Sequence, residues 1–445
     1  MLLVYIPKIS PRSRYIFRLF FKELLGSDCR LTDDKEEFRN YPAAKFSYCP
    51  QPLDNELHIT SCGLISETGI REQTIQVFNW EGGKAFFATG RLSAIPFDPF
   101  AAAFYLVTRY EEYLPHIRDS HDRFDAKESV AWKNGFLKVP VVNRWVLHIA
   151  GLLKERFPQL IFSTSQYQYI STLDIDNAYA FREKGFMRSL GGYIKDLRRL
   201  DFVNMKDRTR VLLGLKKDPY DTYEFQFAMQ KKLGLKTIYF FLVGDYGIND
   251  KNLPIESRRF QSLIKTVGDY AEVGVHPSYG SNRHPERLKV EVSRLANVLH
   301  REVTASRQHF LKLSFPDTYR NLIDLDITDD YTMGFANEIG FRAGICSAFN
   351  FYDLDLEMET RLRIHPFAMM DATLKYYMNV PPEEAIEAIR PMIDEVRGVG
   401  GTFISLWHNE SLSNQKQWEG WLHVYEEMTK LAATPPAHVK EQVVT

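Results

Sequence analysis

The sequence predicts an α/β protein in two parts: a smaller mixed α/β region over residues 1–160 and a larger (β/α) part over residues 166–435. Two observations lead to this prediction. The 445 residues are 44% hydrophobic, which is enough to build sizeable cores. From about Gln166 onward, short apolar runs of β type alternate with helical patterns. Such alternation is typical of βαβ units with parallel strands.

Composition and charge exclude several classes of protein. The 56 Lys and Arg nearly balance the 57 Asp and Glu, and the net charge of −1 argues against nucleic-acid binding as the main role. The apolar runs are far shorter than the ~18 residues of a membrane helix. Met1–Ile6 has no basic residue before it and no cleavage site after it, so we expect a first strand there rather than a signal peptide. The 4 Cys form no CxxC motif. We therefore expect a cytoplasmic protein without a disulfide framework.

The elements expected in the first region follow from caps and apolar patterns. They are a strand at Leu2–Ile6, a helix opened by Ser10-Pro11 and closed by Gly26, a strand at Leu57–Ser61, a helix opened by Asp98-Pro99, and a strand at Leu137–Val142. This region shows no cluster of chemically active residues.

The larger part has seven apolar runs that we expect to be strands. They are Tyr169–Leu173, Thr237–Val243, Ala271–Val275, Val303–Ser306, Phe341–Ile345, Leu362–Ile364 and Thr402–Leu406. Seven strands are enough to close a barrel. A stretch rich in Lys and Arg separates the first two strands, and such a run is either a solvated face or a docking surface for an anionic polymer.

Two carboxylates follow the first of these strands. Because strand side chains alternate, Thr172, Asp174 and Asp176 share one face and the two carboxylates point together. Like charges so close need a cation, and a divalent metal bound by one carboxylate would leave the other free as a general base. In the alternative interpretation, the pair only caps a loop.

Three later strand ends also carry polar residues. His276 is either a metal ligand or a satisfied structural histidine. Arg307 and His309 share a face, and Arg307 either holds the base carboxylate or forms an ordinary bridge on the rim. His408 could act as general acid to a leaving group, or it could be a hydrogen-bonded histidine beside a buried Trp407.

With these residues in order, residues 166–431 resemble the polysaccharide deacetylases of the NodB-homology, carbohydrate esterase type. Members of that family remove acetyl groups from N-acetylated sugars, using a metal held in a distorted (β/α) barrel. The resemblance implies that Asp174 is the base and Asp176 a metal ligand, although the two roles could be exchanged. It also implies His276 as a metal ligand, with Arg307 and His408 as catalytic residues.

Several further segments resemble a branch of this family with an extra N-terminal region whose function the sequence does not reveal. The segments are 330–335, 340–344 and 366–371 in the larger part, and 97–100 and 108–113 in the extra region.

One departure from the family pattern concerns the third metal ligand. The usual second motif is His-x-x-x-His, but Gly280 stands four residues after His276. His309 is our candidate replacement, and Ser278, His365 or an extra water are its rivals. The candidate substrate-binding residues are Trp407, Tyr279 and Asp371.

These residues predict a metal-dependent hydrolase that removes N-acetyl groups from an acetamido sugar or polysaccharide by attack of a metal-bound water. His and Asp ligands suit zinc best, although cobalt, nickel or iron would also fit. Two alternatives remain, a catalytically inactive carbohydrate-binding relative and a metal-dependent amide hydrolase acting on a small non-sugar molecule. The sequence names neither the glycan nor any protein partner.

Overall fold

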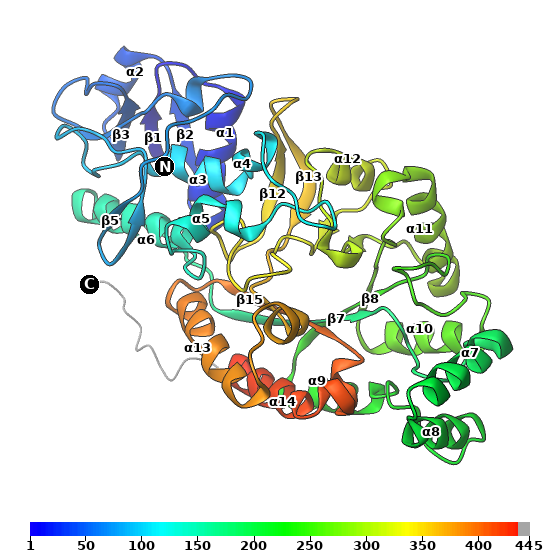
Figure 1. The fold of residues 1–445 in the computed structure, drawn as a ribbon. Helices are drawn as coiled ribbons and strands as arrows, with labels where there is room; N and C mark the ends of the chain where they lie inside the picture. The colour runs from blue at the N-terminus through cyan, green and yellow to red at the C-terminus, as the bar shows by residue number, and fades with distance from the viewer. Residues whose placement is uncertain (435–445) are drawn as a thin grey trace.

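The computed structural model describes residues 1–434 and has a mixed α/β architecture with a small and a large sheet (Figure 1). The predicted end of the larger part, residue 435, lies just outside the described residues. Within residues 1–434, no helix combines the length and the apolar character needed to cross a membrane.

The first region contains a four-stranded parallel sheet in the order β2-β1-β3-β4 and a separate β5-β6 hairpin. The strands are β1 Leu2–Tyr5, β2 Cys29–Thr32, β3 Lys45–Cys49, β4 Leu57–Thr60, β5 Phe78–Trp80 and β6 Gly83–Ala85. The helices are α1 Pro11–Phe17, η1 Arg18–Leu24, α2 Lys35–Asn40, η2 Leu64–Ser66, α3 Pro99–Val107, α4 Tyr110–Tyr113, η3 Ala126–Glu128, α5 Val130–Lys133 and α6 Val141–Arg156.

Helix caps and aromatic packing explain this region. Ser10 forms a capping box at the start of α1, and Asp98 caps α3 through the backbone N–H of Ala101. Every residue of α3 is buried, and Phe100 stacks on Phe17 with ring centroids 4.3 Å apart. The strands and helices predicted around these caps are confirmed. The predicted strand at Leu137–Val142 is wrong, because this segment is a turn that leads into α6.

The large sheet has nine strands in the order β12-β13-β11-β10-β9-β8-β7-β15-β14. The strands are β7 Gln168–Ile175, β8 Lys236–Phe241, β9 Glu272–Val275, β10 Ala305–Ser306, β11 Asp329–Asp330, β12 Phe349–Asp353, β13 Met358–Ile364, β14 Met369–Met370 and β15 Thr402–His408. All neighbours pair in parallel except the β12-β13 hairpin. Since β12 and β14 are unpaired edges within the described residues, a closed barrel is not confirmed.

Helices cover this sheet and connect its strands (Figure 1). They are α7 Gly185–Arg198, α8 Phe202–Leu212, α9 Tyr223–Leu233, α10 Arg258–Tyr270, η4 Ser281–Arg283, α11 Pro285–Leu299, η5 His309–Leu311, α12 Asp317–Ile323, η6 Thr373–Tyr377, α13 Pro382–Gly398, η7 Ser411–Ser413, η8 Lys416–Trp418 and α14 Trp421–Ala433.

Six of the seven predicted strands of the larger part are present, but Phe341–Ile345 is not a strand. Gly340 and Gly344 have φ values of +140° and +65°, which end any extended run between them. The segment instead bonds to the turn before α6. Phe341 N–H donates to the carbonyl of Leu137 at 2.8 Å, and Val142 N–H donates to that of Gly344 at 3.0 Å. The two segments wrongly predicted as strands therefore bond to each other and form a buried contact between the two parts of the chain.

A buried ion cluster also joins the two parts. Glu112 on α4 accepts hydrogen bonds from Arg109 Nε at 2.7 Å and from Arg342 Nε at 2.9 Å and Nη2 at 2.5 Å. The side chains are at most 2% exposed. Burial raises the pKa of Glu112, but Arg342 and Arg109 together hold it below its ordinary value.

We expect Glu112→Ala to lower the free energy of unfolding by about 3–5 kcal/mol, because buried Arg342 loses its counter-ion and buried Arg109 keeps only Glu111. The control is Glu128→Ala, which removes an exposed pair with Lys133 at 3.1 Å and should cost under about 1 kcal/mol. Denaturant unfolding measures both. Because the pKa of Glu112 is lower in the folded chain, its contribution is present above about pH 4.3 and declines as the pH falls further. Equal losses for the two variants would show that the cluster does not stabilise the fold.

Candidate metal centre and active site

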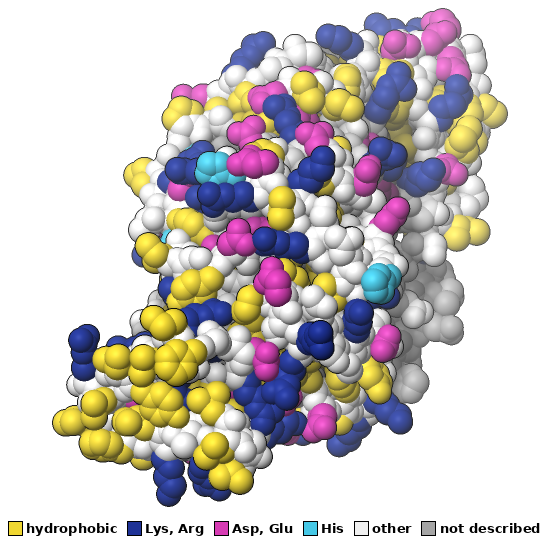
Figure 2. Space-filling model, turned by 90° about the vertical axis from the view of Figure 1, so that its right-hand side faces the viewer, with side chains coloured by type: hydrophobic (Ala, Val, Ile, Leu, Met, Phe, Trp, Pro, Cys, Tyr) yellow, Lys and Arg dark blue, Asp and Glu magenta, His cyan; other side chains and the backbone are white. Residues whose placement is uncertain are grey.

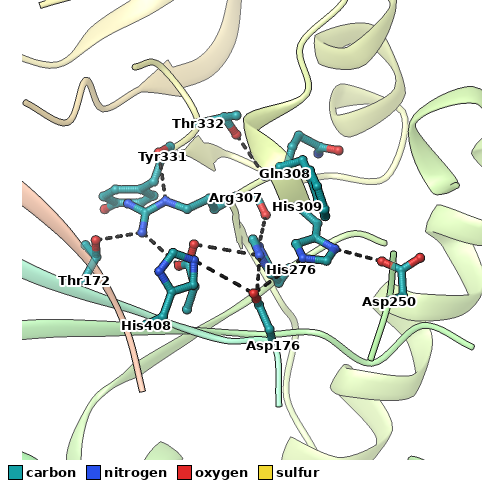
Figure 3. Close-up of polar contacts among 12 residues, drawn as sticks. Thr172, Asp176, Asp250, His276, Arg307, Gln308, His309, Tyr331, Thr332 and His408 are labelled. Atoms are coloured by element: carbon teal, nitrogen blue, oxygen red, sulfur yellow. Dashed lines mark hydrogen bonds and ion pairs between the residues drawn. The ribbon is translucent and has the colours of Figure 1, made fainter. Parts of the chain in front are cut away.

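The polar residues predicted at the strand ends meet at one place. Asp174 and His408 are register partners on the neighbouring strands β7 and β15. Asp176, His276 and Arg307 each lie one residue beyond the end of β7, β9 and β10. Parallel strands bring their carboxyl ends to one edge, so residues far apart in sequence converge there (Figure 3).

Asp176, His276 and His309 form the candidate metal cluster. One ligand atom from each lies within 4.8 Å of the others. The Nε2 atom of His276 is 3.2 Å from Asp176 Oδ1, and that of His309 is 3.5 Å from Asp176 Oδ2. The three groups therefore point their ligand atoms at a common centre (Figure 3). Two imidazoles and a carboxylate are a donor set suited to zinc.

The outer nitrogens of both histidines are occupied by acceptors. His276 Nδ1 lies 2.5 Å from the carbonyl oxygen of Arg307, and His309 Nδ1 lies 2.8 Å from Asp250 Oδ1. A carbonyl can only accept, so Nδ1 of His276 donates a proton to it and Nε2 is turned toward Asp176. Hydrogen bonds of this type orient metal-ligating histidines and raise their basicity.

The electrostatics of the cluster also fit a cation. Burial raises the pKa of Asp176, but His309, His276 and His408 together hold it well below its ordinary value. Burial lowers the pKa of His309, yet Asp176 and Asp250 raise it to about 9. Asp176 Oδ1 is buried and accepts no hydrogen bond. Burying a carboxylate oxygen without a hydrogen-bond donor costs free energy unless a cation binds it. The residues present therefore fit a metal.

Asp174 is held beside the cluster by Arg307. Arg307 Nη1 donates to Asp174 Oδ1 at 2.9 Å and to Thr172 Oγ1 at 2.7 Å, and its Nε donates to the carbonyl of Tyr331 at 3.0 Å. The fully buried guanidinium lies 4.6 Å from the ring centre of Phe240. Asp174 Oδ2 stays free on the cluster side, 3.8 Å from His276 Nε2.

His408 faces the same centre from the other side. Its Nδ1 and its backbone N–H each lie 2.8 Å from the carboxylate of Asp371, while its Nε2 lies 3.9 Å from Asp176 Oδ2. Burial lowers the pKa of His408, but Asp371, Asp176 and Asp174 raise it well above its ordinary value. The imidazole therefore carries a proton on each nitrogen, with Nδ1–H directed at Asp371 and Nε2–H directed at the open space.

These groups form the polar floor of a cavity of about 310 Å³. The walls are mainly apolar and include Leu311, Met370, Leu406, Tyr376 and Tyr377. A concave, mostly apolar cavity with a few convergent polar groups is the usual form of a small-molecule site. Asp174, Asp176, His276, His309 and His408 all line it.

The three residues predicted to bind substrate do not line this cavity, and their role stays a prediction. Trp407 points to the opposite face of β15, where it is fully buried against Tyr425 of α14, with ring centres 5.2 Å apart. Tyr279 packs behind Phe310, with ring centres 5.2 Å apart. Asp371 is fully buried and orients His408.

The rivals of His309 are engaged elsewhere. Ser278 Oγ donates to Glu291 at 2.6 Å, and His365 Nε2 lies 2.7 Å from Asp329 Oδ1. His365 also stacks on Tyr331, with ring centres 4.3 Å apart. Neither residue belongs to the cluster found in the described residues.

Two residues near the cavity were not anticipated from the sequence. Asp250 lies in the loop after β8 and holds His309; its position after a strand end is a signal that could have revealed it. Arg123 lines the cavity from the first region of the chain and donates from Nη1 to the carbonyl of Phe310 at 2.8 Å. It lies some fifty residues before the first motif, and no sequence pattern around it points to the site.

Comparisons with known proteins give a family model and several solved structures. A family of unknown function, DUF7033, matches residues 2–158. No curated protein matches the chain. A provisionally named polysaccharide deacetylase from Mycobacterium smegmatis is 13% identical with a TM-score of 0.40, covering 61% of this chain and 85% of its own.

Two further solved structures are similar to the same share of the chain. A polysaccharide deacetylase from Bacillus cereus is 10% identical with a TM-score of 0.29, covering 59% of this chain and 87% of its own. A mutant of a CE4 family pseudoenzyme is 12% identical with a TM-score of 0.28, covering 60% of this chain and 62% of its own.

Proposed function

We propose that this chain is a metal-dependent hydrolase that removes N-acetyl groups from an acetamido sugar or polysaccharide. The observation that supports the proposal most is the ligand set of Asp176, His276 and His309, which lies between a free carboxylate oxygen of Asp174 and Nε2 of His408. Amide hydrolysis needs a base for water, an electrophile for the carbonyl and an acid for the departing amine.

Asp176, His276 and His309 would hold the metal, and three protein ligands leave a coordination position open, as catalytic zinc sites do. A divalent metal bound there would acidify water and polarise the carbonyl of the substrate.

Asp174 is the base in this proposal. Arg307 fixes Oδ1, so the carboxylate cannot rotate away, and Oδ2 is left to take a proton from the attacking water. The charge-assisted hydrogen bond from Arg307 also keeps the carboxylate in place without covering its reactive oxygen.

His408 is the acid. Asp371 holds the imidazole by Nδ1, which directs the proton on Nε2 toward the cavity and toward the nitrogen of the departing amine. Asp371 therefore acts through His408 as a positioning residue.

The cavity wall suits a sugar with an apolar substituent. Tyr376 and Tyr377 line the cavity and are 49% and 43% exposed overall, so their rings are candidates for packing against a sugar ring. The apolar side chains of Met370 and Leu406 offer a surface for the acetyl methyl group.

Metal content tests the proposal first. Protein purified without chelator should carry about one equivalent of zinc or another divalent metal by elemental analysis. A chelator should remove the metal and lower the melting temperature, because a ligand that binds only the folded state stabilises it. Acetate release from N-acetylated oligosaccharides should disappear with the metal and return when zinc is added.

Two results would contradict the proposal. A protein that neither carries metal nor is stabilised by added zinc would be an inactive carbohydrate-binding relative at most. A zinc protein that hydrolyses small amides but releases no acetate from any N-acetylated sugar would be an amide hydrolase of another substrate class.

A further inference from the structure

Helices α7 and α8 form a hairpin that projects from one end of the molecule (Figure 1). Its surface is unusual for a soluble protein. Of the 24 large hydrophobic side chains that are exposed in the described residues, eleven lie between residues 186 and 215. Figure 2 shows hydrophobic side chains gathered on a projecting lobe at the lower end of the molecule, with Lys and Arg around them.

The exposed side chains form one continuous face. On α7 this apolar face consists of Phe186, Met187, Leu190, Ile194 and Leu197, whose spacing places them on a single side of the helix. Leu200, Phe202 and Val203, in the turn and at the start of α8, add to the exposed apolar surface of the hairpin. The exposed fractions of these side chains run from 43% to 78%.

The inside of the hairpin is polar. Arg208 on α8 donates to Asp196 on α7 from Nε at 3.1 Å and from Nη2 at 2.9 Å, and both residues are buried. Tyr193 and Thr209 share a hydrogen bond of 2.8 Å across the same seam. A Cβ at Gly192 would lie 2.5 Å from Arg208 Nη1, so a larger residue there would push this guanidinium away from its present position beside Asp196. A water-soluble hairpin places its apolar residues between the helices, and this one places them outside.

Contacts at both ends of the hairpin hold this orientation. Asp218 accepts hydrogen bonds from the backbone N–H groups of Ala180 and Phe181 at 2.7 and 2.9 Å. Arg188 donates to the carbonyl of Asn252 at 2.9 Å, and Lys416 pairs with Asp201 at 3.0 Å. The apolar face therefore cannot turn inward without breaking these contacts.

The charge of the hairpin segment indicates which kind of partner binds the apolar face. Residues 182–217 contain eleven Lys or Arg and four Asp or Glu, a net charge of +7, while the whole chain carries −1. A second copy of the chain would bring two such segments together, and their charges would repel each other. An anionic lipid surface instead neutralises the basic residues and accepts the apolar side chains.

We propose that the α7–α8 hairpin docks the protein on an anionic membrane surface, with its apolar face in the lipid interface and its basic residues against the headgroups. This docking is independent of the reaction in the cavity, because none of the hairpin residues named lines it.

Vesicle flotation with the full-length protein tests the proposal. The probes are vesicles of phosphatidylcholine alone and of phosphatidylcholine with phosphatidylglycerol at about 7:3. The protein should float with the anionic vesicles and bind the neutral ones at least about tenfold more weakly. Raising the salt concentration should weaken the anionic binding, because salt screens exposed charges.

Matched variants separate the contributions of apolar and basic residues to vesicle binding. The triple variant Phe186→Ser, Met187→Ser and Val203→Ser should weaken anionic binding at least about tenfold. The control variant Leu92→Ser, Ile117→Ser and Ile161→Ser changes residues that are 62–83% exposed elsewhere and should not change the binding. Arg198→Glu with Arg199→Glu should also weaken binding at least about tenfold. The exposed pair Lys231→Glu with Lys232→Glu on α9 is its control.

Circular dichroism and melting temperature confirm that each variant is folded, and kcat on a soluble substrate should equal that of wild type.

Wild-type protein that stays unbound with both kinds of vesicle would overturn the proposal. So would unchanged flotation of the apolar variant. A dimer in gel filtration that the apolar variant dissociates would assign the face to a second copy of the chain instead.

Discussion

Replacing Asp174 by Asn is expected to lower kcat by about 10²–10⁴-fold while the metal content stays at the wild-type level. Asn has nearly the shape of Asp and can still accept a hydrogen bond from Arg307, so the packing around Thr172 and Phe240 should survive. An amide oxygen cannot take a proton from water at neutral pH, so the base is lost. Acetate release and elemental analysis on the same preparation measure both effects.

The control is Asp245→Asn, which changes an exposed carboxylate paired with Arg294 outside the cavity and should leave kcat unchanged. If Asp174→Asn loses the metal and Asp176→Asn retains it, the roles of the two aspartates are exchanged. If both variants stay active, the reaction does not occur in this cavity.

The position of the candidate site could be predicted because it depends on two regular properties of parallel sheets. Side chains alternate along β7, so Thr172 and Asp174 share a face and both reach Arg307. The carboxyl ends of β7, β9, β10 and β15 lie at one edge, which brings His276 and His408 to the aspartates. The same alternation places Trp407 on the face opposite to His408, a signal that argued against it as a substrate contact.

Short apolar segments were the least predictable part of the fold. Leu137–Val142 and Phe341–Ile345 are as apolar as the true strands, but they are buried against each other in turns. Hydrophobic periodicity over five or six residues does not distinguish a buried strand from a buried turn. The two-residue strands β10, β11 and β14 have no period of their own, so only tertiary pairing defines β11 and β14, which the sequence did not reveal.

His309 lies in the candidate metal cluster, as predicted, but the backbone around it differs from the strand that we expected. We expected it to share a strand face with Arg307, but β10 ends at Ser306 and His309 opens η5. The following residue, Phe310, has a φ of +60°, which turns the chain beside the cavity. Asp250 and Arg123 then fix this turn by bonding His309 Nδ1 and the carbonyl of Phe310. Neither contact can be read from local sequence, since each joins segments more than fifty residues apart.

Replacing His309 by Ala is expected to weaken zinc binding by more than about 100-fold, which is the upper end of what loss of an outer partner costs. The physical reason is the number of ligands. With His309 absent, only Asp176 and His276 remain of the candidate ligand set, because Gly280 supplies no imidazole where a second histidine would usually stand. Competition with a chromophoric chelator measures the affinity, and melting temperatures with and without zinc give an independent measure.

Two further variants test whether zinc affinity depends on the partner of His309 and whether His309 is the third metal ligand. Asp250→Asn leaves His309 in place but weakens the acceptor of its Nδ1–H, so zinc binding should fall by about 10–100-fold. His365→Ala removes a histidine that is likewise bonded to an aspartate, Asp329, but lies outside the cluster, so zinc affinity should equal that of wild type. If His365→Ala loses zinc and His309→Ala retains it, His365 is the third ligand, and the loop after β10 must rearrange around the metal.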